Sequence, residues 1–271
     1  MATFRILHLP LLPSELLAVF QAAWKVSLAL SCLGLFTRAS TISSFILGMY
    51  LLGLPHNFGK LNHIDTIVVI IFGIMALSRC GDAYSIDRVI QRWRQDSNPT
   101  MGRPQASGEY TWPVRAVWLM FALIFFAAGV AKLRHSGLEW VFSDHMAILL
   151  LQQQHIYLAN VDPLATGPPL VPWGAYLAQH VWLTRLIAAA TITFELSYPL
   201  ALFSSKARRI IVPSVFFMLV GIRLLLGPAF LPYMICHLFW IPWDRVSVRL
   251  AKVVRRLALG KHLTLQTKEP S

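Results

Sequence analysis

The sequence predicts an all-helical protein, a polytopic transmembrane helical bundle of about six to eight spans with an additional amphipathic segment at the membrane interface. Of the 271 residues, 56% are hydrophobic and 13% are charged, whereas a soluble globular domain has about 25% charged residues. The mean hydropathy is +0.58, and long apolar runs alternate with short basic loops. Together these observations favour a membrane protein over a soluble domain.

Four apolar segments in the first half of the chain are candidate spans. The first covers residues 14–36. The second, residues 42–54, is roughly half the usual spanning length, so it either extends through residues 55–58 or stops within the bilayer. Residues 66–78 form the third, and residues 113–131 form an unbroken apolar run that is long enough to cross a bilayer.

The second half of the chain alternates between amphipathic and apolar segments. Residues 138–159 are amphipathic and either lie at the interface or dip into the bilayer under a cover of protein. Residues 173–203 are too long for one upright helix, so we expect a tilted helix kinked at Pro199 or a split into two. Residues 210–226 and 229–243 are the last candidate spans.

The basic clusters predict the topology. Residues 79–103, 206–209 and 245–261 carry most of the basic excess, and the positive-inside rule places all three in the cytoplasm. This topology predicts a multi-pass protein of the cell membrane with a cytoplasmic C-terminus. It also explains the net charge of +12 without a nucleic-acid partner.

Two regions follow from this topology. Residues 1–243 form the transmembrane domain, and residues 244–271 form a basic amphipathic cytoplasmic tail. Apolar and basic residues alternate along the tail, which is typical of a helix on the anionic lipids of the inner leaflet. The cysteines, Cys32, Cys80 and Cys236, are too far apart in sequence to indicate a metal or redox motif.

Most of the remaining ionisable groups fall on the predicted outer side. Polar groups at membrane depth are costly, so they usually line a cavity or pair with one another. Glu195 is the exception to this outer grouping. The members of the group are Lys60, His63, Asp65, Lys132, His135, His145, His155 and His180.

The segment around Lys60 and His63 has two interpretations. If a helix begins near Lys60, the two side chains share a face at a spacing of three residues. The alternative is an ordinary hydrophilic hairpin loop. A metal site is not predicted, because His63 and Asp65 do not fall on one helical face.

Lys132 is the most informative single residue, because it ends the apolar run of residues 113–131. A lysine withdrawn from water loses proton affinity and can act as a general base near neutral pH. The competing interpretation is an anchor whose ammonium group snorkels to the interface, which spacing alone favours.

Two further features also have paired interpretations. The amphipathic stretch containing His145, the glutamines at 152–154 and His155 either roofs a pocket or exposes a solvated face. Glu195 is either a buried, hydrogen-bonded helix partner, which we favour, or part of a proton relay.

The segment Phe125-Phe126-Ala127-Ala128-Gly129-Val130-Ala131-Lys132-Leu133, followed by Gly137-Leu138-Glu139-Trp140, resembles the signature of HTTM-domain membrane proteins. These proteins are bacterial relatives of the vitamin K-dependent gamma-carboxylase. Residues 195–203 with the basic turn that follows, residues 56–65 and Cys80-Gly81-Asp82-Ala83 also resemble that family. The resemblance covers about residues 15–245.

The resemblance implies a chemistry for Lys132. In the carboxylase, a lysine deprotonates a hydroquinone that then reacts with oxygen, and the resulting base prepares a glutamate side chain for carboxylation. It therefore implies a quinone or hydroquinone cofactor, no metal, and an outward-facing pocket. Candidate catalytic residues are Lys132, Lys60 and His63, and candidate cofactor-binding residues are Trp140, His145, His155 and His180.

The chain departs from the family pattern in two places. A short basic tail stands where the carboxylase has a large soluble domain, and Phe216-Phe217-Met218 stands where the family often has a histidine. The alternatives are a non-catalytic membrane ligand-binding or carrier protein and a DoxX-like quinone-linked subunit. The expected partners are membrane lipid and a peptide or small-molecule substrate, with no nucleic acid.

Overall fold

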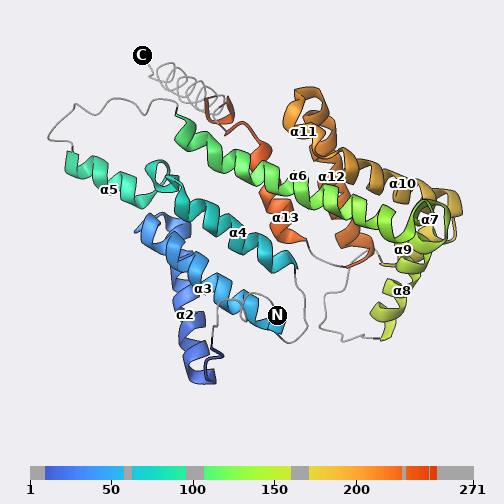
Figure 1. Ribbon diagram of the computed structural model, residues 1–271, viewed down its shortest axis with the longest axis horizontal. Helices are drawn as coiled ribbons and strands as arrows, with labels where there is room; N and C mark the ends of the chain where they lie inside the picture. Colours follow the sequence, from blue (N-terminus) through green and yellow to red (C-terminus); the bar gives the residue numbers. More distant parts are fainter. Residues whose placement is uncertain are drawn as a thin grey trace, which may run out of the picture.

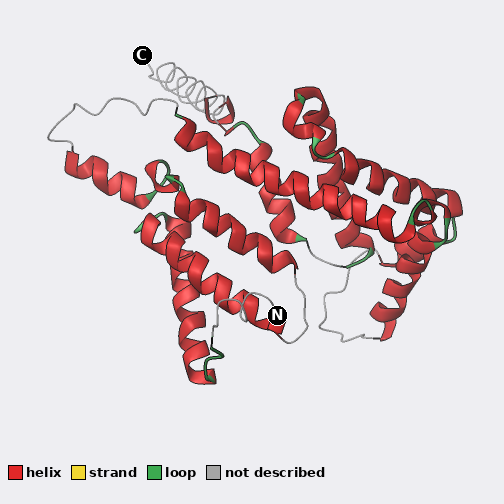
Figure 2. Cartoon of the chain, viewed as in Figure 1, coloured by secondary structure: helices red, strands yellow, loops and turns green. Residues whose placement is uncertain are grey.

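The computed structural model describes residues 10–57, 63–95, 107–159, 171–227, 230–243 and 245–248. Within these ranges the chain is helical and contains no strand (Figure 2). The predicted all-helical class is confirmed. Most of the cytoplasmic tail expected over residues 244–271 lies outside the described residues.

The N-terminal helices form one group on the left side of Figure 1, with α2 and α3 lowest. Gly34 ends the first helix in the left-handed conformation, with φ of 66°, and its N–H bonds back to the carbonyls of Leu30 and Ser31. The next helix can therefore turn back and pack against the first. The helices of this group are α2 (Ser14–Leu33), α3 (Thr37–Asn57), α4 (His63–Leu77), the 3-10 turn η1 (Cys80–Asp82) and α5 (Ile86–Gln95).

Small polar side chains hold α2 against α3. The Ser44 hydroxyl bonds to the Ser27 hydroxyl at 2.9 Å, and the Trp24 indole donates to the Ser44 carbonyl at 3.1 Å. Gly48 leaves room for the Trp24 ring. Close approach through small residues and interhelical hydrogen bonds is typical of helix pairs in membranes.

The remaining helices gather around α6 and α10, and α6 crosses the upper part of Figure 1. The core around α6 includes Phe121, Phe125, Tyr198 and Val215, all at least 95% buried. The helices of this part are α6 (Gly108–Ser136), α7 (Glu139–Phe142), α8 (His145–Ala159), α9 (Val171–Ala178), α10 (Val181–Ser197), α11 (Leu200–Phe203), α12 (Ser205–Leu225), α13 (Leu231–Cys236) and the 3-10 turn η2 (His237–Trp240).

The structure decides between several of the alternatives left by the sequence. The short second segment extends as α3 to Asn57. The long segment over 173–203 is split, with breaks between α9 and α10 and at Tyr198-Pro199. The amphipathic segment becomes α7 and α8, and Met146 and Leu150 of α8 are buried against Ala178 and Ala188. A protein cover is therefore the better description of that segment.

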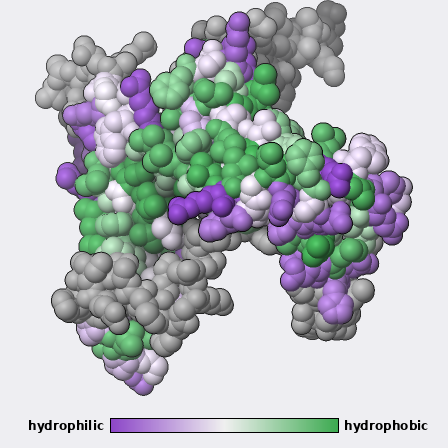
Figure 3. Space-filling model, turned by 45° about the vertical axis from the view of Figure 1, so that its right-hand side comes forward, coloured by the Kyte–Doolittle hydropathy of each residue, from purple (hydrophilic) through white to green (hydrophobic). Residues whose placement is uncertain are grey.

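Two of the described helices, α2 and α6, are long and apolar enough to cross a bilayer. The 18-residue apolar window of α2 is only 6% buried within the molecule, and its surface includes exposed Val19, Val26 and Leu33. Figure 3 shows hydrophobic residues gathered across the middle of one face. These features indicate an association with membranes, while the six to eight crossings expected from the sequence are not established by helix length.

Candidate functional site

A buried ion pair joins the end of α6 to α10. The Lys132 ammonium nitrogen lies 2.7 Å from both carboxylate oxygens of Glu195. The Glu195 side chain is 7% exposed and that of Lys132 is 22% exposed. Charge-assisted bonds of this length are among the stronger polar contacts in proteins, so the pair is a fixed feature of the helix interface.

Gly129 allows the two helices to approach at this point. It lies one turn before Lys132 on α6, and a Cβ atom there would come within 3.0 Å of Leu196 and 3.1 Å of the Glu195 Cβ. The lack of a side chain at Gly129 therefore lets the helices come close enough for the ammonium and carboxylate groups to meet.

Trp140 lies beside the ion pair, and His145 lies against Trp140. The Lys132 nitrogen lies 5.4 Å from the centre of the Trp140 ring, within the range of a cation–π contact. The His145 ring lies 4.5 Å from the same indole. The indole N–H of Trp140 is buried and has no hydrogen-bond partner within the described part of the chain. A buried donor left without a partner is costly, and it is suited to an oxygen atom of a ligand.

Burial and the short contacts act in opposite directions on the charges of the pair. Burial disfavours each charge taken alone, whereas the two short contacts favour both charges together. Moving one proton from the Lys132 ammonium to the Glu195 carboxylate turns the ion pair into a neutral amine and a carboxylic acid. The neutral amine then has a lone pair, which is what a general base requires.

The structure brings some of the predicted site residues together and leaves others apart. Trp140 contacts Lys132, and His145 contacts Trp140. His180 precedes α10, where its ring contacts Tyr176. His155 is exposed on α8, and His135 is exposed near the end of α6. Lys60 lies outside the described residues, and so does the side chain of His63, whose backbone begins α4.

The sequence prediction for Glu195 is correct in one respect and wrong in another. It is a buried, hydrogen-bonded helix partner. It is not separate from the group that contains Lys132, because the fold brings α10 back alongside α6. An acid and a lysine in apolar segments each need a partner, and that shared need is the signal that could have paired them.

The anchor interpretation of Lys132 does not describe its geometry. A snorkelling ammonium group extends to water along the helix, but the Lys132 nitrogen is turned toward a carboxylate that is 7% exposed. The side chain is therefore held between helices.

His237 is a buried residue that the sequence did not single out. The centre of its ring lies 5.7 Å from the centre of the Phe216 ring. A histidine from η2 therefore lies beside Phe216 of α12. The ring Nδ1 donates to the Tyr233 carbonyl at 2.8 Å, and Nε2 has no partner among the residues that the structure describes.

No known protein family, curated protein or solved structure was found to match the chain. Over the ranges that the structure describes, no three histidine, cysteine or acidic side chains are grouped to hold a metal ion. Functional conclusions therefore rest on the geometry around Lys132.

Proposed function

We propose that the protein is a membrane enzyme, similar to HTTM-domain proteins, whose Lys132–Glu195 pair removes a proton from a lipid-soluble hydroquinone. The observation that carries the proposal is the 2.7 Å contact of the Lys132 nitrogen with both Glu195 oxygens in a buried setting. A lysine that only anchored the helix end at the interface would not need a buried carboxylate partner.

Each residue has a role in the proton transfer. Glu195 accepts a proton from the Lys132 ammonium group, which leaves a neutral amine. The amine then takes the proton of the substrate hydroxyl and becomes an ammonium ion again, next to the new oxyanion. That ammonium ion stabilises the negative charge, as positioned cations do in other enzymes.

The residues around the pair fit a flat aromatic ligand. The unpartnered indole N–H of Trp140 supplies a donor for a ligand oxygen, and the Trp140 and His145 rings offer aromatic surface. A bound hydroquinone would supply the electrons for reaction with oxygen, leading to oxidation or to carboxylation of a second substrate. Secondary candidates for contacts with this ligand are Lys60, His63, His155 and His180.

The proposal includes a membrane arrangement. The chain crosses the cell membrane six to eight times, with the Lys132 site facing outward and the C-terminus in the cytoplasm. Support comes from the basic clusters of the sequence and from the apolar helices α2 and α6. The basic tail lies on anionic lipids, and no nucleic acid takes part.

Quinol-dependent oxygen uptake by the purified protein tests the proposal. Replacing Lys132 with alanine is expected to abolish the uptake, because no amine remains to accept the proton. Arg134→Ala, which removes an exposed cation two residues away, is the matched control and is expected to keep the uptake. Equal uptake by the Lys132→Ala and unmutated proteins would overturn the role of Lys132.

A binding measurement separates the enzyme from the non-catalytic alternative. If the unmutated protein binds the quinol but consumes no oxygen, and instead accumulates a ligand in sealed vesicles, the carrier function is correct and the enzyme is not.

A further inference from the structure

A cavity lies far from Lys132, between α4 and the first turns of α6. Its volume is about 220 Å³, and its wall is mainly apolar. Ile74, Val114, Val117 and Phe239 form part of this wall. Residues 109–117 precede Lys132 by 15 to 23 positions, which corresponds to roughly 22–35 Å along a helix. The cavity is therefore separate from the proposed site of chemistry.

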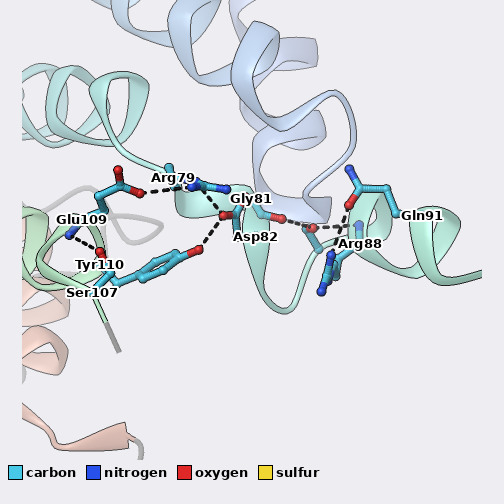
Figure 4. Close-up of polar contacts among 9 residues, drawn as sticks. Arg79, Gly81, Asp82, Arg88, Gln91, Ser107, Glu109 and Tyr110 are labelled. Carbon is cyan, nitrogen blue, oxygen red and sulfur yellow. Dashed lines mark hydrogen bonds and ion pairs between the residues drawn. The ribbon is translucent and has the colours of Figure 1, made fainter. Parts of the chain in front are cut away.

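Three polar side chains, Arg79, Glu109 and Tyr110, line this cavity, and Asp82 is bonded to Arg79 and Tyr110. We call these four residues the rim cluster, and Figure 4 shows their contacts. The Arg79 guanidinium bonds to Asp82 at 2.8 Å and to Glu109 at 3.0 Å. The Tyr110 hydroxyl donates to the same Asp82 oxygen at 2.7 Å. The cluster ties the turn after α4 to the start of α6.

The rim cluster carries a net negative charge and has carboxylate oxygens without partners. Two carboxylates and one guanidinium give it a net charge of −1. The bonds above engage one oxygen of Asp82 and one of Glu109, and the second oxygen of each carboxylate has no bond to the described residues. Pro113, which also lines the cavity, has no N–H for the Glu109 carbonyl one turn earlier. The mouth of an apolar cavity is thus suited to a group with several N–H donors.

We propose that this cavity binds a phospholipid with an ethanolamine headgroup. Its primary ammonium group has three N–H donors for the open oxygens of Asp82 and Glu109. The second terminal amino group of Arg79, which the two ion pairs do not use, faces the phosphate. Part of one acyl chain fills the apolar part of the cavity. The proposal rests on the membrane location proposed above, and it is independent of the chemistry at Lys132.

Charge and donor count distinguish this lipid from other common lipids. A choline headgroup has the same net charge, but its quaternary nitrogen has no N–H to donate. A glycerol headgroup brings a net negative charge to a rim that is already negative. Both are therefore expected to bind more weakly than the ethanolamine lipid with the same acyl chains.

Native mass spectrometry of the full chain in mild detergent tests this order. The probes are ethanolamine, choline and glycerol phospholipids with identical acyl chains, each titrated at equal concentrations. We expect one ethanolamine lipid to bind with about tenfold lower Kd than either of the other two. Equal binding of the ethanolamine and choline lipids, or preference for the glycerol lipid, would overturn the proposal.

Two kinds of variant locate the site. Val114→Trp places a large ring in the cavity and should remove the tight binding, whereas Leu119→Trp, at a 51% exposed position of the same helix, should not. Glu109→Gln keeps the side-chain shape and should reduce the preference for ethanolamine over choline. Tight ethanolamine binding retained by both Val114→Trp and Glu109→Gln would place the lipid elsewhere.

The lipid-binding and oxygen-uptake measurements test the two proposals independently. An unmutated protein that selects the ethanolamine lipid but shows no quinol-dependent oxygen uptake supports this site and overturns the proposed enzyme. The reverse pattern overturns the lipid site alone.

Discussion

At the scale of single residues, the contact between Lys132 and Glu195 organises the proposed site. Removing one member of a buried ion pair leaves the other charge unpaired, which costs about 3 kcal/mol or more. We therefore expect Glu195→Leu and Lys132→Leu each to lower the free energy of unfolding by about that amount. The double variant should recover much of the loss, because an apolar pair can replace a buried ion pair.

Unfolding of the three variants in mixed detergent micelles measures this coupling. Losses that simply add in the double variant would contradict the contact, because independent sites are additive and paired ones are not.

Asp87 is a second residue whose charge is set by its partners. It accepts bonds from the backbone N–H groups of Thr37 and Phe36 and from the Thr37 hydroxyl, at 2.7–2.9 Å. The Thr37 backbone bond contributes most to holding the pKa of Asp87 below its ordinary value. A residue at the start of α5 thus caps the start of α3.

The lowered pKa gives a signed pH dependence. The stability that Asp87 contributes is fully present above the unfolded pKa of about 3.9, and it is lost as the pH falls through the lower folded value. We expect Asp87→Asn to cost about 1 kcal/mol at neutral pH, because the amide nitrogen cannot accept the bonds that one carboxylate oxygen accepts, and less in acid. Stability curves of the two proteins that stay parallel down to pH 2 would contradict the cap.

At the scale of elements, the packing of α6 against α10 depends on Gly129. A leucine at this position would overlap Leu196 and Glu195, so we expect Gly129→Leu to lower stability by about 1–3 kcal/mol. Gly221 on α12 has open space where a Cβ atom would lie and is the matched control. Thermal unfolding of Gly129→Leu and Gly221→Leu should differ by that amount, and equal effects would show that the helices do not meet closely at Gly129.

The elements also show what the sequence can predict. Composition was enough for the helical class, because apolar runs of this length have few other solutions in lipid. The division of residues 138–159 and 173–203 into short helices could not be predicted from the sequence, because it depends on how α8, α9 and α10 pack against one another. The shared need of Lys132 and Glu195 for a partner could have paired them, whereas their 2.7 Å contact depends on α10 returning alongside α6 over a separation of 63 residues.

At the scale of the whole molecule, the proposed topology predicts which surfaces face each side of the membrane. In a variant without Cys32, Cys80 and Cys236, single cysteines replace Glu139 and Lys206, both exposed. A membrane-impermeant maleimide should label Glu139→Cys in intact cells. It should label Lys206→Cys only after the membrane is permeabilised. Labelling of both positions in intact cells would contradict the topology.

The most direct measurement of the central claim is the distance between the Lys132 side-chain nitrogen and the Glu195 carboxyl carbon in lipid bilayers. Solid-state NMR of protein labelled with ¹⁵N-lysine and ¹³C-glutamate measures the dipolar coupling between the two nuclei, and Lys132→Met identifies the signal. The structure predicts a strong coupling, because the nitrogen lies 2.7 Å from both carboxylate oxygens. A Lys132 signal without coupling to any glutamate carboxyl carbon would contradict the buried acid–base pair and the function built on it.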